Sequence, residues 1–200
     1  MQSFKRDDRP NYQLPRKASH LFLSKLFARK ATANEAIIIR TYETIVAAAR
    51  QPLYFSDWSV PDTALGRFES LSLHMILFLR RAKAASGPLR ELAQEVVEEF
   101  FKDVDHSLRE LGIGDAGVPK RMKKLAKMFY GRADSYDKAI ADNDHEALAA
   151  ALHRNINPNI QEWPHAADMA NRVFNLVTNL DEQDDESLVA GNLSFPKASL

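Results

Sequence analysis

Four side chains that could hold a metal ion or exchange a proton lie in two stretches of helical pattern. They are Glu69 and His74 in the first stretch, and Asp103 and Asp105 in the second. Helical bundles build di-metal sites from Glu-x-x-His pairs, because a three-residue spacing puts both ligands on one face of a helix. Glu69 and His74 are five residues apart and therefore point to different faces. A metal-dependent helical-bundle enzyme that uses these four residues is kept as an alternative function.

A structural ion-pair network is the preferred interpretation of the same polar residues. A charge in an apolar helix must be paired or hydrogen-bonded, or its pKa shifts until the group is neutral. Arg67 accompanies Glu69 and His74, and Arg109 follows Asp105 by one helical turn. We expect this network to fix the register of two central helices, with no catalytic residue, no metal and no cofactor. Its predicted members are Asp62, Arg67, Glu69, His74, Asp103, Asp105, Arg109 and Asp115.

Three glycines follow these aspartates in a G-x-G-x-x-G pattern, at Gly112, Gly114 and Gly117. In a dinucleotide-binding fold such glycines follow a β-strand and open a helix. Here they follow a long amphipathic helical pattern, so the sequence predicts a corner between two helices. Gly112 is expected to end the first helix, and Asp115 is expected to cap the second.

A basic run follows the corner, with six Lys or Arg and no acid between residues 120 and 132. Apolar residues alternate with it at helical spacing, so one face should pack inward while the lysines project outward. The lysines form either a solvated surface or a contact for an anionic partner such as ribosomal RNA or phospholipid. An aromatic loop at residues 52–61 could plug the core or form part of a docking groove. The residues predicted to bind a partner protein are Tyr54, Phe55, Trp58, Lys120, Lys123, Lys124, Lys127, Tyr130 and Arg132.

Composition limits the remaining classes of function. The 200 residues carry no cysteine, which excludes thiol catalysis, disulfides and Cys-based zinc sites. The formal net charge is zero, so DNA is not an expected partner, and an RNA-binding helical module is kept only as an alternative. No apolar run approaches the roughly 20 residues that span a bilayer. We expect a soluble protein that contacts a membrane only at its surface.

The elements that must position these residues are all helical. We expect an all-α fold, a single globular domain of seven to eight helices around a central buried helix near residues 71–79. Thr32 should begin a helix through a capping box with Glu35, Gly131 should end one, and Pro164 should lie in the first turn of another. The expected organisation is a disordered basic arm at residues 1–18, a helical domain at 19–181 and an acidic flexible tail at 182–200.

Five motifs stand in order between residues 40 and 156. They are Tyr42-x-x-Ile-Val-x-x-Ala-Arg50-Gln-Pro, Val60-Pro-Asp-Thr-x-x-Gly66-Arg67-Phe-Glu69-x-Leu-x-Leu-His74, the stretch from Asp103-x-Asp105 to Lys123, Phe129-Tyr-Gly-Arg132, and Leu152-x-Arg-Asn155. Together they resemble the ubiquinol–cytochrome c chaperone family, whose members are assembly factors for cytochrome b of respiratory complex III.

The resemblance implies a non-enzymatic assembly chaperone that binds newly made cytochrome b and promotes assembly of the ubiquinol–cytochrome c reductase complex. It also implies contact with a membrane surface and a ribosome, and a small partner subunit as in mitochondrial relatives. Because those relatives carry long presequences and this chain has a short basic arm, we expect a bacterial-type member. The expected location is cytoplasmic, peripherally associated with the inner membrane, with the matrix side of the mitochondrial inner membrane as the alternative.

Overall fold

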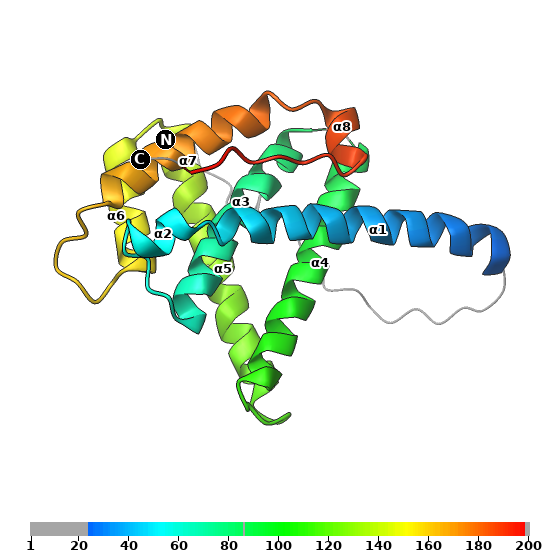
Figure 1. The fold of residues 1–200 in the computed structure, drawn as a ribbon, viewed down its shortest axis with the longest axis horizontal. Coiled ribbons are helices and arrows are strands. Elements are labelled where there is room, and N and C mark those ends of the chain that lie inside the picture. Colours follow the sequence, from blue (N-terminus) through cyan, green and yellow to red (C-terminus); the bar gives the residue numbers. More distant parts are fainter. Residues whose placement is uncertain (1–23, 86, 199–200) are drawn as a thin grey trace, which may run out of the picture.

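The computed structural model describes residues 24–85 and 87–198, and every regular element within them is an α-helix. This confirms the all-α prediction. Figure 1 shows α1 crossing α3 and α4, while α6 and α7 lie side by side at one end of the bundle. The helices are α1 (Ser24–Ala49), α2 (Pro52–Ser56), α3 (Ala64–Ala84), α4 (Gly87–Glu110), α5 (Val118–Ala141), α6 (His145–Ile156), α7 (Ala166–Asp181) and α8 (Asp185–Val189).

The central helix is α3, as the sequence predicts, and it contacts α1, α4, α5, α6 and α7. Thr63 begins it, because the Thr63 hydroxyl oxygen accepts a hydrogen bond from the N–H of Gly66 at 3.1 Å. Burial of each large apolar side chain in its middle stabilises the fold by about 1.5–3 kcal/mol. Those side chains are Leu73, Met75, Ile76, Leu77 and Phe78. No helix in residues 24–85 and 87–198 is long and apolar enough to cross a membrane.

The corner between α4 and α5 confirms one glycine prediction and corrects a capping prediction. Gly112 has a φ of +79° and its N–H donates to the carbonyl of Arg109 at 2.9 Å, so it is the left-handed glycine that follows α4. The N-cap of α5 is Gly117, which has no capping side chain. The prediction that Asp115 caps α5 is therefore wrong, because the Asp115 carboxylate pairs with the Arg109 guanidinium instead.

Three further predicted helix boundaries are wrong. α1 runs through Thr32 without a break, because helix-forming residues on both sides outweigh the local capping signal. α5 runs through Gly131, and the burial of Phe129 and Tyr136 on either side exceeds the roughly 1 kcal/mol that a glycine costs inside a helix. α7 begins only after Pro164, with His165 as its N-cap.

The C-terminal segment packs against the bundle, which corrects the prediction of an acidic flexible tail from residue 182. Leu188 and Leu193 are buried, and the ring of Phe195 lies 5.7 Å from the ring of His74. Asp185 accepts a hydrogen bond from Arg81 at 2.5 Å. The five acids of residues 181–186 suggested a solvated segment, but the apolar residues that follow them anchor it. Residues 1–18 and 199–200 of the predicted arm and tail lie outside the described residues.

Candidate functional site

A buried ion pair joins α3 to α5. The Glu69 side chain is 1% exposed and accepts two hydrogen bonds from the Arg132 guanidinium, from Nε and, at 2.5 Å, from Nη2. Burial raises the pKa of Glu69 to about 7, although the hydrogen bonds from Arg132 act to lower it. Arg132, which the sequence assigned to a binding surface, is thus directed into the bundle. It pairs with Glu69 although it is not a member of the predicted ion-pair network.

His74 belongs to a chain of hydrogen bonds that joins α7, α2 and α3. Its Nδ1 lies 2.8 Å from the carbonyl oxygen of Ser70, which can only accept, so Nδ1 carries the proton. Nε2 then accepts from the Tyr54 hydroxyl at 3.2 Å, and that hydroxyl in turn accepts from Arg172 at 3.4 Å. Burial lowers the pKa of His74 to about 4. The imidazole is therefore an uncharged structural group.

The other predicted network members form separate contacts at the surface or at its edge. Asp103 accepts from the Tyr42 hydroxyl at 2.6 Å, and this contact holds α4 against α1. Asp62, which precedes α3, pairs at 2.6 Å with Arg67 in the first turn of that helix. The third contact, at the end of α4, consists of Asp105, Arg109 and Asp115.

The eight predicted residues thus do not form one network, and the structure corrects that part of the hypothesis. The physical reason is that the five carboxylates and His74 each have a partner close by, so the eight residues divide into separate contacts. No group of three or more His, Cys, Asp or Glu among residues 24–85 and 87–198 is placed to hold a metal ion.

The aromatic segment at residues 52–61 contains the short helix α2. Of the two alternatives that the sequence left open for it, packing into the core is the one that the structure shows for Tyr54 and Trp58. Tyr54 and Trp58 are buried, and Phe55 is half-buried. The indole N–H of Trp163 donates to the carbonyl of Trp58 at 2.8 Å, which ties the loop before α7 to this segment. In this arrangement Tyr54 and Trp58 stabilise the fold and do not present their rings at a surface.

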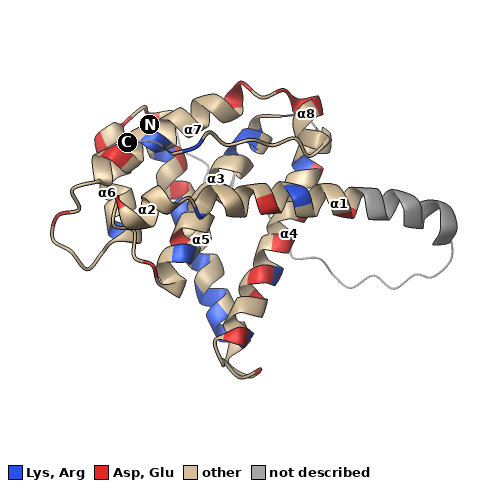
Figure 2. Cartoon of the chain, viewed as in Figure 1, with Lys and Arg blue, Asp and Glu red and all other residues tan. Residues whose placement is uncertain are grey.

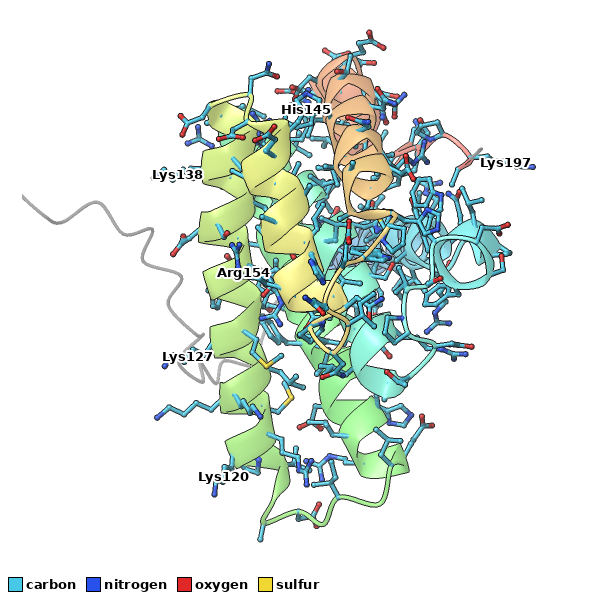
Figure 3. The ribbon with its side chains drawn as sticks, turned by 90° about the vertical axis from the view of Figure 1, so that its left-hand side faces the viewer. Lys120, Lys127, Lys138, His145, Arg154 and Lys197 are labelled. Carbon is cyan, nitrogen blue, oxygen red and sulfur yellow. The ribbon has the colours of Figure 1, made fainter. Side chains whose placement is uncertain are left out.

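The lysines of α5 form an exposed basic face, defined by Lys120, Lys123, Lys124 and Lys127. Figure 2 shows basic residues repeating along the lower part of α5, and Figure 3 shows Lys120 and Lys127 on its outer side. None of the four takes part in an ion pair within the described residues. Tyr130 lies beside this face, 36% exposed, with its ring 5.3 Å from the ring of Phe129.

An apolar groove of about 570 Å³ lies between the start of α3, the end of α4 and the start of α5. Leu65 and Leu111 line it and are 51% and 62% exposed, although both are large apolar residues. Its other apolar lining includes Phe68, Leu108, Ile113 and Leu125.

The sequence does not reveal this groove, because Leu111 continues the helical spacing of the buried residues Val104 and Leu108. The available signal was its position: Leu111 follows the last residue of α4 and precedes the Gly112 turn, where no further helix covers it.

Comparisons with known proteins agree with the predicted family. The family model described as Ubiquinol-cytochrome C chaperone matches residues 56–195. The protein named Ubiquinol-cytochrome c reductase complex assembly factor 1 from Drosophila melanogaster is 27% identical over 118 residues, which cover 56% of this chain and 45% of that protein. The chain thus spans less than half of the length of this curated relative.

A solved structure supports the same conclusion. The crystal structure of the Cbp3 homolog from Brucella abortus is 58% identical, with a TM-score of 0.80, and the match covers 86% of this chain and 94% of that one. The family match confirms the predicted family and its chaperone class, and the structural match confirms the all-α fold.

Proposed function

We propose that this chain, which belongs to the ubiquinol–cytochrome C chaperone family, is a non-enzymatic assembly chaperone that binds newly made cytochrome b. In this role it promotes assembly of the ubiquinol–cytochrome c reductase complex. The observation that carries the proposal is the family match over residues 56–195, a range that contains the basic face and the lining of the apolar groove apart from Ala49 and Arg50.

The surface of the bundle supports binding of a membrane protein before it is assembled. Such a client exposes apolar segments, and these require an apolar surface on the chaperone that a monomer leaves open. The apolar groove provides two exposed leucines from different elements, Leu65 and Leu111. The sequence had offered the aromatic segment for this role, but its Tyr54 and Trp58 rings are buried.

The basic face supports association with an anionic surface beside the client. Four lysines without ion pairs on one helix attract phospholipid headgroups, each contributing about 1 kcal/mol near the bilayer surface. We therefore propose a peripheral position at the cytoplasmic side of the inner membrane, and a bacterial-type member of the family. Contact with a ribosome and a small partner subunit remain part of the proposal on the grounds of the sequence resemblance alone.

Deletion of the encoding gene tests the proposal. In the deletion strain we expect loss of the assembled ubiquinol–cytochrome c reductase complex on native gels and loss of its electron-transfer activity. Transcription and translation of cytochrome b should continue, and the plasmid-borne wild-type chain should restore assembly. Normal amounts of the assembled complex in the deletion strain would contradict the proposal.

A further inference from the structure

The strap, residues 193–198, follows α8 and lies across the bundle in an extended form. We propose that the strap occupies a binding site for an extended segment of a partner protein. A partner segment takes the place of the strap when it carries an aromatic residue followed by proline. This site is separate from the basic face and the apolar groove, and the inference does not depend on the identity of the client.

The burial of the strap alternates along its length. Leu193 is buried and Phe195 is half-buried, whereas Ser194 and Pro196 are exposed. Successive side chains of an extended chain point to opposite sides. One side of the strap therefore packs on the helices and the other faces solvent. Figure 1 shows the strap running back from α8 between α7 and α1.

Two glutamine side chains hold the strap by its backbone. The side-chain amide of Gln183 accepts a hydrogen bond from the N–H of Ser194 and donates one to the carbonyl oxygen of Ser194, both at 2.9 Å. The side-chain amide of Gln51 accepts from the N–H of Ala198 and donates to the carbonyl oxygen of Pro196 at 3.4 Å. Each amide thus pairs with one N–H and one carbonyl, as a neighbouring β-strand would.

These contacts recognise a backbone rather than a sequence. Arg172 of α7 also donates to the carbonyl oxygen of Pro196. Every hydrogen bond from Gln51, Arg172 and Gln183 to the strap thus involves a backbone N–H or carbonyl, which any extended segment can supply. The position of Pro196 contributes only its carbonyl, so a proline suits it, and the fixed φ of proline reduces the entropy lost on binding.

The ring of Phe195 makes the side-chain contact that selects an aromatic residue. It lies 5.7 Å from the ring of His74 in an edge-on arrangement, and the ring of His74 lies 5.4 Å from that of Tyr54. Edge-on aromatic pairs contribute stability beyond the area that they bury. His74 and Tyr54 are buried residues of α3 and α2, so the bundle itself builds this ring site.

The strap leaves part of the site unfilled. A hollow of about 470 Å³ lies between the strap, α1 and α2, and its lining includes Ala47, Ala48 and Leu53. Protein interiors are close-packed, with few voids larger than a water molecule. A segment with a larger apolar residue in place of Ala198 would fill this hollow. The site therefore suits occupants other than the strap itself.

Hydrogen exchange of the wild-type protein tests whether the strap can leave its site. The hydrogen bonds to Ser194 and Pro196 lie at the surface, where water competes for them. We expect residues 193–198 to exchange at least about a hundredfold faster than α7, because local opening needs less free energy than global unfolding. Equal protection of the strap and α7 would overturn the inference, since the site would then open only when the protein unfolds.

A fluorescent peptide with the sequence of the strap tests whether the site accepts a separate segment. Binding to the full-length protein is measured by fluorescence anisotropy. In the wild type the attached strap competes at an effective concentration on the order of millimolar, so the peptide should bind weakly. Phe195→Ala removes the anchor of the attached strap and should raise the affinity for the peptide at least about tenfold. Equal affinity of the wild type and this variant, or no binding to the variant at about 1 mM peptide, would overturn the inference.

Two controls, made in the Phe195→Ala variant, test where the peptide binds. Adding Gln51→Ala removes a backbone contact and should weaken peptide binding at least about threefold, whereas adding Gln161→Ala, at an exposed position in the loop before α7, should leave it unchanged. A peptide with alanine in place of its phenylalanine should bind at least about tenfold more weakly. Equal effects of the two glutamine substitutions, or equal binding of the two peptides, would overturn the inference. Far-ultraviolet circular dichroism checks that every variant keeps the helical fold.

Discussion

Replacement of Arg132 by methionine should destabilise the bundle, because it leaves the Glu69 carboxylate buried without its partner. Removal of one member of a buried ion pair costs about 3–5 kcal/mol. The Arg132 side chain is only 12% exposed, so solvent does little to screen the pair. Methionine retains most of the apolar length of arginine, which makes loss of the charge the main effect of the substitution.

The cost of this substitution should depend on pH, with a sign that follows from the pKa of Glu69. Burial already raises that pKa from 4.5 to about 7, so the folded state holds the proton more tightly and stability falls as the pH rises through this window. Without Arg132 the pKa of Glu69 rises further. The variant should therefore continue to lose stability above pH 7, where the wild type no longer does so through this group.

Urea unfolding followed by circular dichroism at pH 5 and pH 8 measures both effects. Adding Glu69→Gln to Arg132→Met should remove the pH dependence and recover part of the stability, with a coupling of about 1–3 kcal/mol. Two results together would refute a buried ion pair. Arg132→Met would lower the free energy of unfolding by less than about 1 kcal/mol at pH 8, and its effect would simply add to that of Glu69→Gln in the double variant. If the variant were fully stable and failed only to bind the client, Arg132 would belong to the binding surface that the sequence predicted.

Three further predictions concern other parts of the molecule. Burial lowers the pKa of His74 from 6.5 to about 4, so its contribution to stability is lost as the pH falls through that window; His74→Gln should lose less stability than the wild type between pH 7 and pH 4.5 in urea unfolding. Gly66→Ala should lower the free energy of unfolding by about 1–3 kcal/mol or more, because a Cβ there would lie 1.9 Å from the Pro61 carbonyl oxygen; unchanged thermal stability would show that the start of α3 can move away. Conversion of the basic face to glutamate changes Lys120, Lys123, Lys124 and Lys127. This variant should keep a melting temperature within a few degrees of the wild type and should no longer sediment with anionic vesicles. Conversion of Lys138 to glutamate, farther along α5, should leave sedimentation with the vesicles intact.

The fold class and several helix ends could be predicted from the sequence because local signals determine them. The stripe of α4 is buried at every third or fourth position from Leu89 to Leu108. Asp144, a residue type that favours the N-cap position, caps α6 by accepting from the N–H of Ala147 at 2.8 Å, and Gly112 ends α4 as the sequence predicts. These features depend on residues within one or two helical turns of each other.

Features that depend on contacts distant in sequence could not be predicted. Glu69 and Arg132 are 63 positions apart, and nothing in the local pattern of either residue names the other. The packing of the C-terminal segment depends on a helix far earlier in the chain, because the ring of Phe195 lies against the ring of His74 in α3. The apolar groove likewise arises only where the ends of three helices meet, and a single-helix pattern marks Leu111 as a core residue.

Capture of newly made cytochrome b tests the proposed function most directly. Respiring cells that produce the tagged full-length protein are labelled with a short pulse of isotopic amino acids, and proteins recovered from solubilised membranes are identified by mass spectrometry. We predict that labelled cytochrome b is enriched over an untagged control and declines during a chase as the reductase complex assembles. Recovery of cytochrome b at the level of the untagged control would contradict the proposed function.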